Sequence, residues 1–387
     1  MTRPKGFAAA GVHCGIKAGD ALDLALVATT DGRPVPAAAV FTSNKAVAAP
    51  VAVSRAHLEA TGGHAAAVVL NSGNANAATG AEGRAHAERT CALVAEGLGC
   101  APEEVLVCST GLIGIPLPME AVESGIGPLL EAKKDREETG ALAAQAILTT
   151  DTRAKETMIG HGWYTLGGMA KGAAMLAPNL ATMLAVLTTD VTATPEELQE
   201  ALRAAVAETF NRLSIDGCTS TNDTVIVLAS GKVGRPPKGA LTEGLLLACR
   251  DLAEQTADDA EGATKVVTVR VIGAASAEDA HRAARKVAES QLVQCSLYGG
   301  DPYWGRIVSE LGSSGAAFDP DRVAVSYGGV VVCRDGVAAA HDEERVRAHM
   351  AGRVIELTAD VGLGDGEAAV LTTDLSPAYI DENMRTS

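Results

Sequence analysis

The chain of 387 residues is 47% hydrophobic and only 3% aromatic, and it contains 41 glycines. Its length exceeds the size at which one hydrophobic core stops growing, so we expect two structural lobes. The 32 basic and 48 acidic residues give a formal charge of −16, which repels phosphate backbones and anionic lipid surfaces. Nucleic acid and membranes are therefore poor candidates for partners.

The sequence gives no sign of a targeting segment or a metal site. No stretch approaches 18 uninterrupted apolar residues, and the start MTRPKGFAAAGVHCG lacks the apolar core of a secretory signal, so we expect a cytoplasmic protein. The eight cysteines form no C-x-x-C pair and no zinc-binding pattern. We expect most of them to be small buried residues. Most histidines lie in polar surroundings typical of the solvated surface, namely His57, His64, His86, His281, His341 and His349.

Strand-like and helix-like segments alternate along the chain, which is typical of an α/β architecture. The apolar run ending at Val68–Leu70 predicts a buried strand, and the NSGNANAATG segment that follows predicts turns with unusual backbone angles. A helix is expected from about Glu82 to Leu98. The next strand, EVLVCS, is expected to break at Thr110 and Gly111. Further helices are predicted from Met119 to Lys133 and from Glu137 to Leu148.

In the second half of the chain, the clearest helix is TPEELQEALRAAVAETF. Thr194 can cap it, Pro195 occupies its first turn, and Glu197 stands at the capping-box position. The tetrapeptide LTTD occurs three times at irregular spacing, so no structural repeat is inferred. The chain contains no Pro/Ser-rich linker, so a division into domains joined by a flexible tether is not supported. Later elements are helices near Leu241 to Thr256 and Ser276 to Ser290, and the strands KVVTVRVIGA and RVAVSYGGVVVC.

The sequence contains no G-x-S-x-G, H-E-x-x-H or G-x-x-x-x-G-K-[ST] motif. A hydroxyl can still be activated if its residue becomes the first of a chain, because a free α-amino group has a pKa of about 8 and can accept the proton of that residue's own Oγ. Thr182 is a candidate, since it interrupts an apolar run and follows the small Ala181, which suits a cut between the two. The pattern ATML alone is more typical of an ordinary strand residue.

The segment AKGAAMLAPNLATML resembles the self-cleavage segment of the ornithine acetyltransferase family, which recycles acetyl groups in arginine biosynthesis. Nine other blocks resemble that family in the same order over nearly the whole chain. They are GFAAAGVHCGIK, FTSNKAVAAPV, NSGNANAATG, CSTGLIG, TTDT, FNRLSIDGCTSTNDT, DAEGATK, GGDPYWGR and TTDLSPAY.

The resemblance implies a fold, a processing event and a reaction. The fold is a layered α/β sandwich of two lobes, similar to N-terminal-nucleophile enzymes. Cleavage between Ala181 and Thr182 would leave an alpha chain (1–181) and a beta chain (182–387), assembled into a heterotetramer or larger. Thr182 would take the acetyl group from N2-acetylornithine and pass it to glutamate in a ping-pong reaction. No cofactor is implied, and acetyl-CoA stays open as a second acetyl donor.

The resemblance also assigns site residues. Thr110 and Gly111 match the oxyanion-hole pair, which must hold donors toward the charge that develops on the acetyl oxygen. A Ser-Thr-Gly sequence after a strand is otherwise an ordinary turn. The substrate-binding positions by the same matching are Thr149, Lys171, Thr182, Glu261, Asn383 and Ser387. Lysine and threonine suit an α-carboxylate, and a glutamate suits the δ-ammonium of ornithine.

The chain also departs from the family pattern. Tyr303 replaces the asparagine of the usual D-P-N-W-G-R, Gln294 stands where a lysine is common, and Tyr298 lies near a usual histidine. The tail ENMRTS is one residue shorter than usual and lacks its tyrosine, so the last hydroxyl is that of Ser387 or of Thr386.

Two other functional hypotheses remain. A self-processing amidohydrolase or aminopeptidase would keep the terminal threonine but give the acyl group to water. A non-enzymatic metabolite-binding protein would use the Gly/Asn-rich loops only to bind a ligand.

Overall fold

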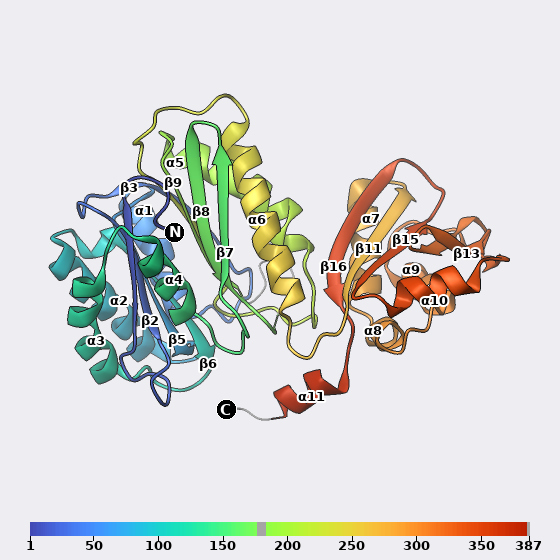
Figure 1. Cartoon of the computed structure of the whole chain (residues 1–387), viewed down its shortest axis with the longest axis horizontal. Coiled ribbons are helices and arrows are strands. Elements are labelled where there is room, and N and C mark those ends of the chain that lie inside the picture. Colours follow the sequence, from blue (N-terminus) through green and yellow to red (C-terminus); the bar gives the residue numbers. More distant parts are fainter. Residues whose placement is uncertain (176–182, 385–387) are drawn as a thin grey trace.

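The computed structural model describes residues 1–175 and 183–384. Its first lobe is built on two sheets that lie face to face (Figure 1). The first sheet has the order β1-β2-β5-β6, formed by β1 (Phe7–Val12), β2 (Leu24–Thr29), β5 (Ala67–Asn74) and β6 (Val105–Leu112). The second has the order β4-β3-β10-β9-β8-β7, formed by β4 (His64–Ala65), β3 (Val35–Phe41), β10 (Thr224–Ala229), β9 (Leu184–Thr189), β8 (Tyr164–Lys171) and β7 (Lys155–His161).

Helices cover the outer face of each sheet, which gives four layers. The first sheet packs against α1 (Ala49–Ala60), α2 (Gly80–Leu98) and α3 (Met119–Ala132), and the second against α5 (Pro195–Glu208) and α6 (Ala240–Asp258). The helix α4 (Glu137–Ala146) adds Ala143 and Ala144 to the core between the two sheets. The sandwich is therefore of the layered α/β kind that the sequence predicts.

Strand β5 illustrates why the strand sequences are continuous apolar stretches. Val68 and Leu70 point into the core between the sheets, whereas Ala67 and Val69 pack under the outer helices. Because both faces of the strand are buried, alternation of polar and apolar residues is absent. Small residues in the facing strands, such as Ala37 and Ala39, keep the two sheets close.

The second lobe holds a third sheet with its own core (Figure 1). The strand order is β14-β13-β12-β15-β11-β16, from β14 (Val337–Ala338), β13 (Val330–Arg334), β12 (Ala324–Tyr327), β15 (Val354–Asp360), β11 (Val266–Ala274) and β16 (Gly366–Thr373). The accompanying helices are α7 (Ala277–Ala288), α8 (Gln291–Tyr298), α9 (Trp304–Ser313) and α10 (Glu343–Ala351). After β16 the chain turns back toward the first lobe as α11 (Pro377–Asn383).

Most elements agree with the sequence predictions, and the cap of α5 agrees atom by atom. Thr194 Oγ1 accepts from the backbone N–H of Glu197 at 3.2 Å, while Glu197 Oε2 accepts from the N–H of Thr194 at 2.8 Å. One prediction is wrong: β6 does not break at Thr110 but continues through Leu112. The strand continues because β5 pairs with it as far as Asn74, so part of the predicted turn is also strand.

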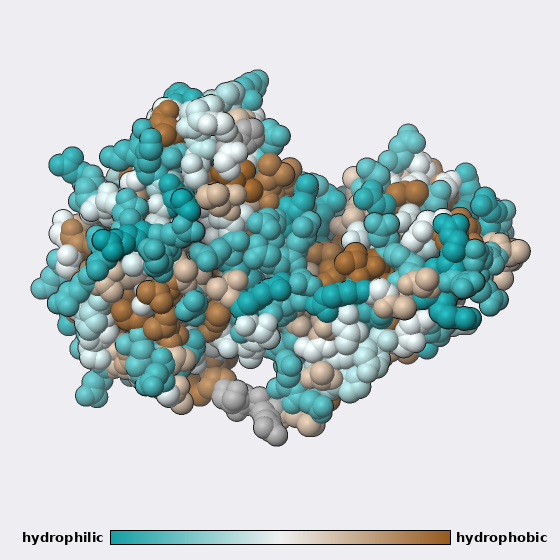
Figure 2. All heavy atoms as spheres, in the orientation of Figure 1, coloured by the Kyte–Doolittle hydropathy of each residue, from teal (hydrophilic) through white to brown (hydrophobic). Residues whose placement is uncertain are grey.

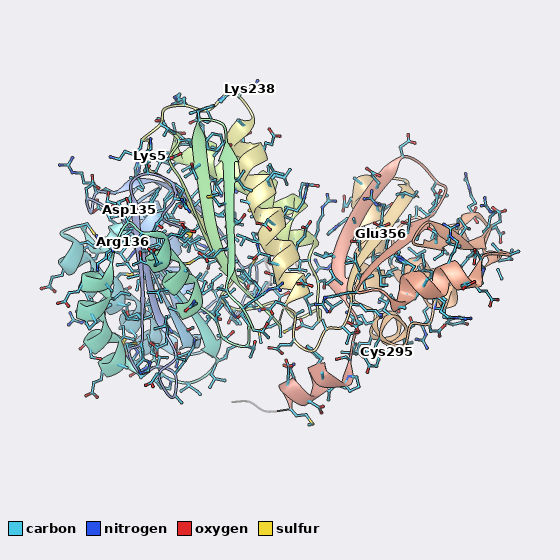
Figure 3. The ribbon with its side chains drawn as sticks, in the orientation of Figure 1. Lys5, Asp135, Arg136, Lys238, Cys295 and Glu356 are labelled. Atoms are coloured by element: carbon cyan, nitrogen blue, oxygen red, sulfur yellow. The ribbon has the colours of Figure 1, made fainter. Side chains whose placement is uncertain are left out.

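The predictions for cysteine and histidine were only partly right. Cys91, Cys108, Cys249 and Cys333 are buried, but Cys218 and Cys295 are exposed, the latter on α8 (Figure 3). Of the six histidines, only His341 is exposed; the rest are half-buried, as where His57 Nδ1 lies 2.8 Å from the carbonyl of Val105. His349 is half-buried in the same way, because its Nε2 accepts from the backbone N–H of Glu356 at 2.9 Å.

The visible surface is largely hydrophilic, with separate hydrophobic patches over both lobes (Figure 2). Within residues 1–175 and 183–384, no helix is long and apolar enough to cross a membrane.

Candidate active site

A cavity of about 520 Å³ lies where the first lobe meets the returning α11. Its lining comes from many separate segments: Lys17, Gly73, Ala75, Thr110, Gly111, Leu112, Ile113, Thr149, Thr150, Lys171, Ala174, Met175, Asp216, Cys218, Ser220, Thr221, Asn222, Glu261, Tyr379, Glu382 and Asn383. Every predicted site residue among the described positions is in this set. A larger groove of about 960 Å³, between α1 and α5, holds none of them.

The end of β6 supplies Thr110 and Gly111. Thr110 is buried, and Gly111 has a φ of 132°, a conformation that favours glycine. A Cβ on Gly111 would lie 2.3 Å from the carbonyl carbon of Gly73 and 2.5 Å from the backbone nitrogen of Asn74. Only glycine therefore fits where the two strands end side by side at the cavity wall.

Lys171, the last residue of β8, is one of two lysines that line the cavity. It is 3% exposed, and its Nζ donates to Thr149 Oγ1 at 2.6 Å and to Thr110 Oγ1 at 3.3 Å. Burial lowers the pKa of Lys171, and nearby Lys155 lowers it further, while Asp151 opposes both. Lys17, whose pKa burial also lowers, is a second ammonium on this wall.

Acidic side chains and helix α11 form another part of the cavity lining. Glu261 is buried, and Asn383 Nδ2 donates to Glu261 Oε2 at 2.7 Å. Gly262, at φ 62°, lets the helix approach: a Cβ there would lie 2.2 Å from the backbone nitrogen of Tyr379. Tyr379 in turn donates to Asp216 Oδ2 at 3.3 Å. Burial, and then Glu261, raises the pKa of Glu382 on the same helix.

The predicted positions Ala181, Thr182 and Ser387 lie outside the described residues, as does Thr386. Of the described residues nearest the predicted cut, Met175 lines the cavity, and Met183 is buried, its N–H donating to Asp223 Oδ1 at 3.0 Å. Six predicted residues thus meet at one cavity, namely Thr110, Gly111, Thr149, Lys171, Glu261 and Asn383.

Sequence reasoning missed Lys17, Asp216, Tyr379 and Glu382 as lining residues. Three of them lie within segments that resemble the family. Lys17 is the last residue of GFAAAGVHCGIK, Asp216 belongs to FNRLSIDGCTSTNDT, and Tyr379 is the last residue of TTDLSPAY. The blocks were therefore the available signal, although nothing within one block shows which side chain points at a cavity.

The three departures from the family pattern do not line this cavity. Gln294 is buried between the lobes, where its Nε2 donates to the carbonyls of Ile215 and Ala288 at 2.8 and 3.2 Å. Tyr298 and Tyr303 are exposed on the second lobe, at 44% and 54%.

A comparison with family models agrees with the order of the matched blocks, because the ArgJ family model matches residues 8–386. The chain belongs to the ArgJ family. Two curated relatives are named arginine biosynthesis bifunctional protein ArgJ. The one from Mycobacterium bovis is 49% identical over 100% of this chain and 96% of its own length. The one from Thermobifida fusca is 47% identical over 100% and 99%.

A solved structure is also similar, the ornithine acetyltransferase of Mycobacterium tuberculosis complexed with ornithine. It is 44% identical over 47% of this chain and 95% of that chain, with a TM-score of 0.44. Membership of the ArgJ family confirms the resemblance seen in the sequence and the expectation of an acetyltransferase enzyme of arginine biosynthesis.

Proposed function

We propose that this ArgJ family member transfers an acetyl group from N2-acetylornithine to glutamate through an acetyl-threonine on Thr182. The observation that carries the proposal is the cavity, which brings together Thr110, Gly111, Thr149, Lys171, Glu261 and Asn383 from separate segments. Its lining carries both signs of charge, with ammonium groups on Lys17 and Lys171 and carboxyl groups on Asp216, Glu261 and Glu382. That arrangement suits amino acids that carry an α-carboxylate and, in ornithine, a distal ammonium.

The proposed chemistry has two acyl transfers. The α-amino group of Thr182, exposed by cleavage after Ala181, accepts the Oγ proton as Oγ attacks the acetyl carbon. A C–O bond forms, the C–N bond breaks, and the proton leaves with the departing amine of ornithine. The amine of glutamate then attacks the ester, which releases N-acetylglutamate and returns the proton to Oγ. Thr110 and Gly111, at the cavity wall, are the proposed donors to the developing oxyanion.

Lys171 and Thr149 are proposed to bind the α-carboxylate, and Glu261, oriented by Asn383, the side-chain ammonium. Ser387 is also proposed to contact the substrate. We further propose that chains 1–181 and 182–387 associate as a heterotetramer or larger in the cytoplasm, and that acetyl-CoA serves as a second donor without any cofactor.

Two measurements test the proposal. On denaturing electrophoresis the wild type should give two fragments of similar size, and Thr182→Ala a single full-length band. Purified protein given acetylornithine should release ornithine only when glutamate is present, and a parallel assay with acetyl-CoA and glutamate tests the second donor. Equal ornithine release without glutamate would instead identify an amidohydrolase. An uncut but fully active wild type would contradict the mechanism.

A further inference from the structure

A buried charged cluster lies directly behind the basic wall of the cavity. Lys155, at the start of β7, has no exposed surface, and its Nζ lies 2.7 Å from Asp151 Oδ1 and 2.6 Å from Asp259 Oδ2. Asp259 also accepts from both the backbone N–H and the hydroxyl of Thr152. Burying an ammonium is costly unless it is paired and hydrogen-bonded, and here both carboxylates are ordered around it.

Asp151 connects this cluster to the cavity. Besides Lys155, its carboxylate accepts from the backbone N–H of Gly172 at 2.7 Å and that of Thr149 at 3.1 Å, and it lies 3.8 Å from Lys171 Nζ. Burial would raise the pKa of Asp151, but Lys171, Lys155 and the hydrogen bond from Gly172 lower it to about 2. The carboxylate is therefore charged at neutral pH. It fixes the Thr149 loop and the end of β8 at one point.

Lys171 determines the direction in which two hydroxyls can donate. An ammonium has three donors and no acceptor, so Thr110 and Thr149 must accept from it. Each hydroxyl has one proton, which must then point away from Lys171. Since both residues line the cavity, an O–H donor is available there for a substrate oxygen. A neutral lysine could accept that proton instead and remove the donor from the cavity.

We propose that Asp151 and Lys155 are positioning residues, which hold Lys171 so that the hydroxyls of Thr110 and Thr149 donate into the cavity during acyl transfer. This inference rests on the proposed function. Neither residue lines the cavity, and both act through Lys171. Asp259 and Thr152 extend the same chain of contacts from behind Lys155. The cluster is thus an ordered support for the two hydroxyl donors and not an isolated surface ion pair.

The test is the pH dependence of acetyl transfer by Asp151→Asn. The titratable groups that act on Lys171 are Asp151, Lys155, Glu261 and Asp223, and Lys17 is a further neighbour. Asp151 is the largest of the groups that favour its charged form, so its loss moves the pKa of Lys171 further down. The ammonium is then lost as pH rises through this lowered pKa. Loss of a donor to an oxyanion costs about 100- to 1,000-fold in kcat, and we expect about 10- to 100-fold here at pH 8, since the backbone donor remains.

Activity should be expressed per cleaved chain, with the cleaved fraction read from a denaturing gel. Expected are a fall in kcat, a smaller loss at pH 6 than at pH 8, and recovery in Asp151→Glu. KM should rise in the same pH direction, because Lys171 and Thr149 are also proposed to bind the α-carboxylate. Arg153→Ala is the matched control and should keep the wild-type profile. Arg153 lies two residues after Asp151, but it is exposed and pairs with Asp258. Should Asp151→Asn not fold or not cleave, Asp259→Asn should give a smaller loss in the same pH direction.

An unshifted pH profile, or a loss confined to KM, in the variant that folds would overturn the positioning role. A wild type that transfers no acetyl group would instead overturn the proposed function itself. The two failures are therefore distinguishable in one set of assays.

Discussion

The backbone N–H of Met183 donates to Asp223 Oδ1 at 3.0 Å, so a buried carboxyl holds the residue that directly follows Thr182 in the sequence. Asp223 has no exposed surface, and its Oδ2 has no hydrogen-bond partner within residues 1–175 and 183–384. Burial raises the pKa of Asp223 well above 3.8, although the hydrogen bond from Met183 opposes this. The carboxyl beside the proposed cleavage site is therefore protonated at pH values where an exposed aspartate is charged.

The first prediction concerns the stability of Asp223→Asn. Below the unfolded-state pKa of about 4 the residue is protonated in both states and contributes no pH dependence. As pH rises above that value, the unfolded chain releases the proton and the folded chain keeps it, so wild-type stability falls. Asparagine lacks this contribution and can still accept from Met183. The Tm of Asp223→Asn minus that of the wild type should therefore increase between pH 4 and pH 7.

Thermal melts of both proteins across this range check the result. An Asp223→Leu control should melt lower at every pH, because the Met183 N–H then loses its buried acceptor. A difference that stays constant from pH 4 to pH 7 would contradict the raised pKa.

The second prediction concerns Gly111→Ala. The new Cβ would lie 2.3 Å from Gly73, and alanine rarely adopts a φ of 132°. Backbone strain of this kind costs about 1–3 kcal/mol even before the clash, and we expect the variant to melt lower and to transfer acetyl groups at least tenfold more slowly. Gly127→Ala is the control, because that glycine lies in α3 and a Cβ there meets no heavy atom within 4 Å.

Denaturant unfolding and the acetyl-transfer assay measure the two effects. Equal stability and activity of Gly111→Ala and Gly127→Ala would show that β5 and β6 do not approach as described.

The third prediction concerns Asn383→Ala in α11. Asn383 orients the carboxylate of Glu261 through a 2.7 Å hydrogen bond. A hydrogen bond to a charged group contributes about 1.5–3 kcal/mol when buried, and less at this partly exposed site, so we expect KM for acetylornithine to rise by about tenfold or less. The KM for glutamate, which has no side-chain ammonium, should change less.

Steady-state kinetics with each substrate varied in turn provides the measurement. Asp381→Ala, an exposed position of the same helix, should leave both constants unchanged. An equal rise for both substrates would indicate that α11 only closes the cavity.

The fourth prediction concerns Gln294 between the lobes. Its Nε2 is surrounded by three acceptors, the carbonyls of Ile215 and Ala288 and Thr372 Oγ1. An amide nitrogen has two hydrogens and an ammonium has three, so the lysine common in the family can satisfy the same acceptors. Gln294→Lys should therefore lose less stability than Gln294→Leu, although its buried ammonium would have no carboxylate among these acceptors. Gln294→Leu should lose about 1–3 kcal/mol because buried acceptors lose their donor.

Chemical denaturation of the two variants tests this pair. If leucine were tolerated as well as lysine, the contact between the lobes would not depend on these hydrogen bonds.

The sequence predicted the elements whose signal is local. The helix cap at Thr194 and the apolar strand through Leu70 could be predicted because a few neighbouring residues determine each of them. The end of β6 was misplaced since its last residues are held by pairing with β5, which lies more than thirty residues earlier. Local turn preference at Thr110 and Gly111 was overridden by this tertiary contact.

The same distinction between local signals and tertiary contacts applies to the candidate site. Motif resemblance singled out Lys171 and Glu261, and both line the same cavity, yet neither residue alone looks different from a solvated charge. The support behind Lys171 was not predicted, because Lys155 and Asp259 are 104 positions apart in the sequence and meet only in the folded chain. Contacts at that separation leave no periodic pattern in the sequence.

The strand order of the second sheet bears on when the proposed cut can occur. Strands β9 and β10 come from the chain after Thr182, and they lie between β8 on one side and β3 on the other, which both come from the chain before it. The two halves are therefore interleaved within one sheet and do not dock as finished modules. Neither half can complete this sheet alone, so folding of the intact precursor has to come first and the cut second. Once made, the cut would leave two polypeptides that separate only when the sheet itself unfolds.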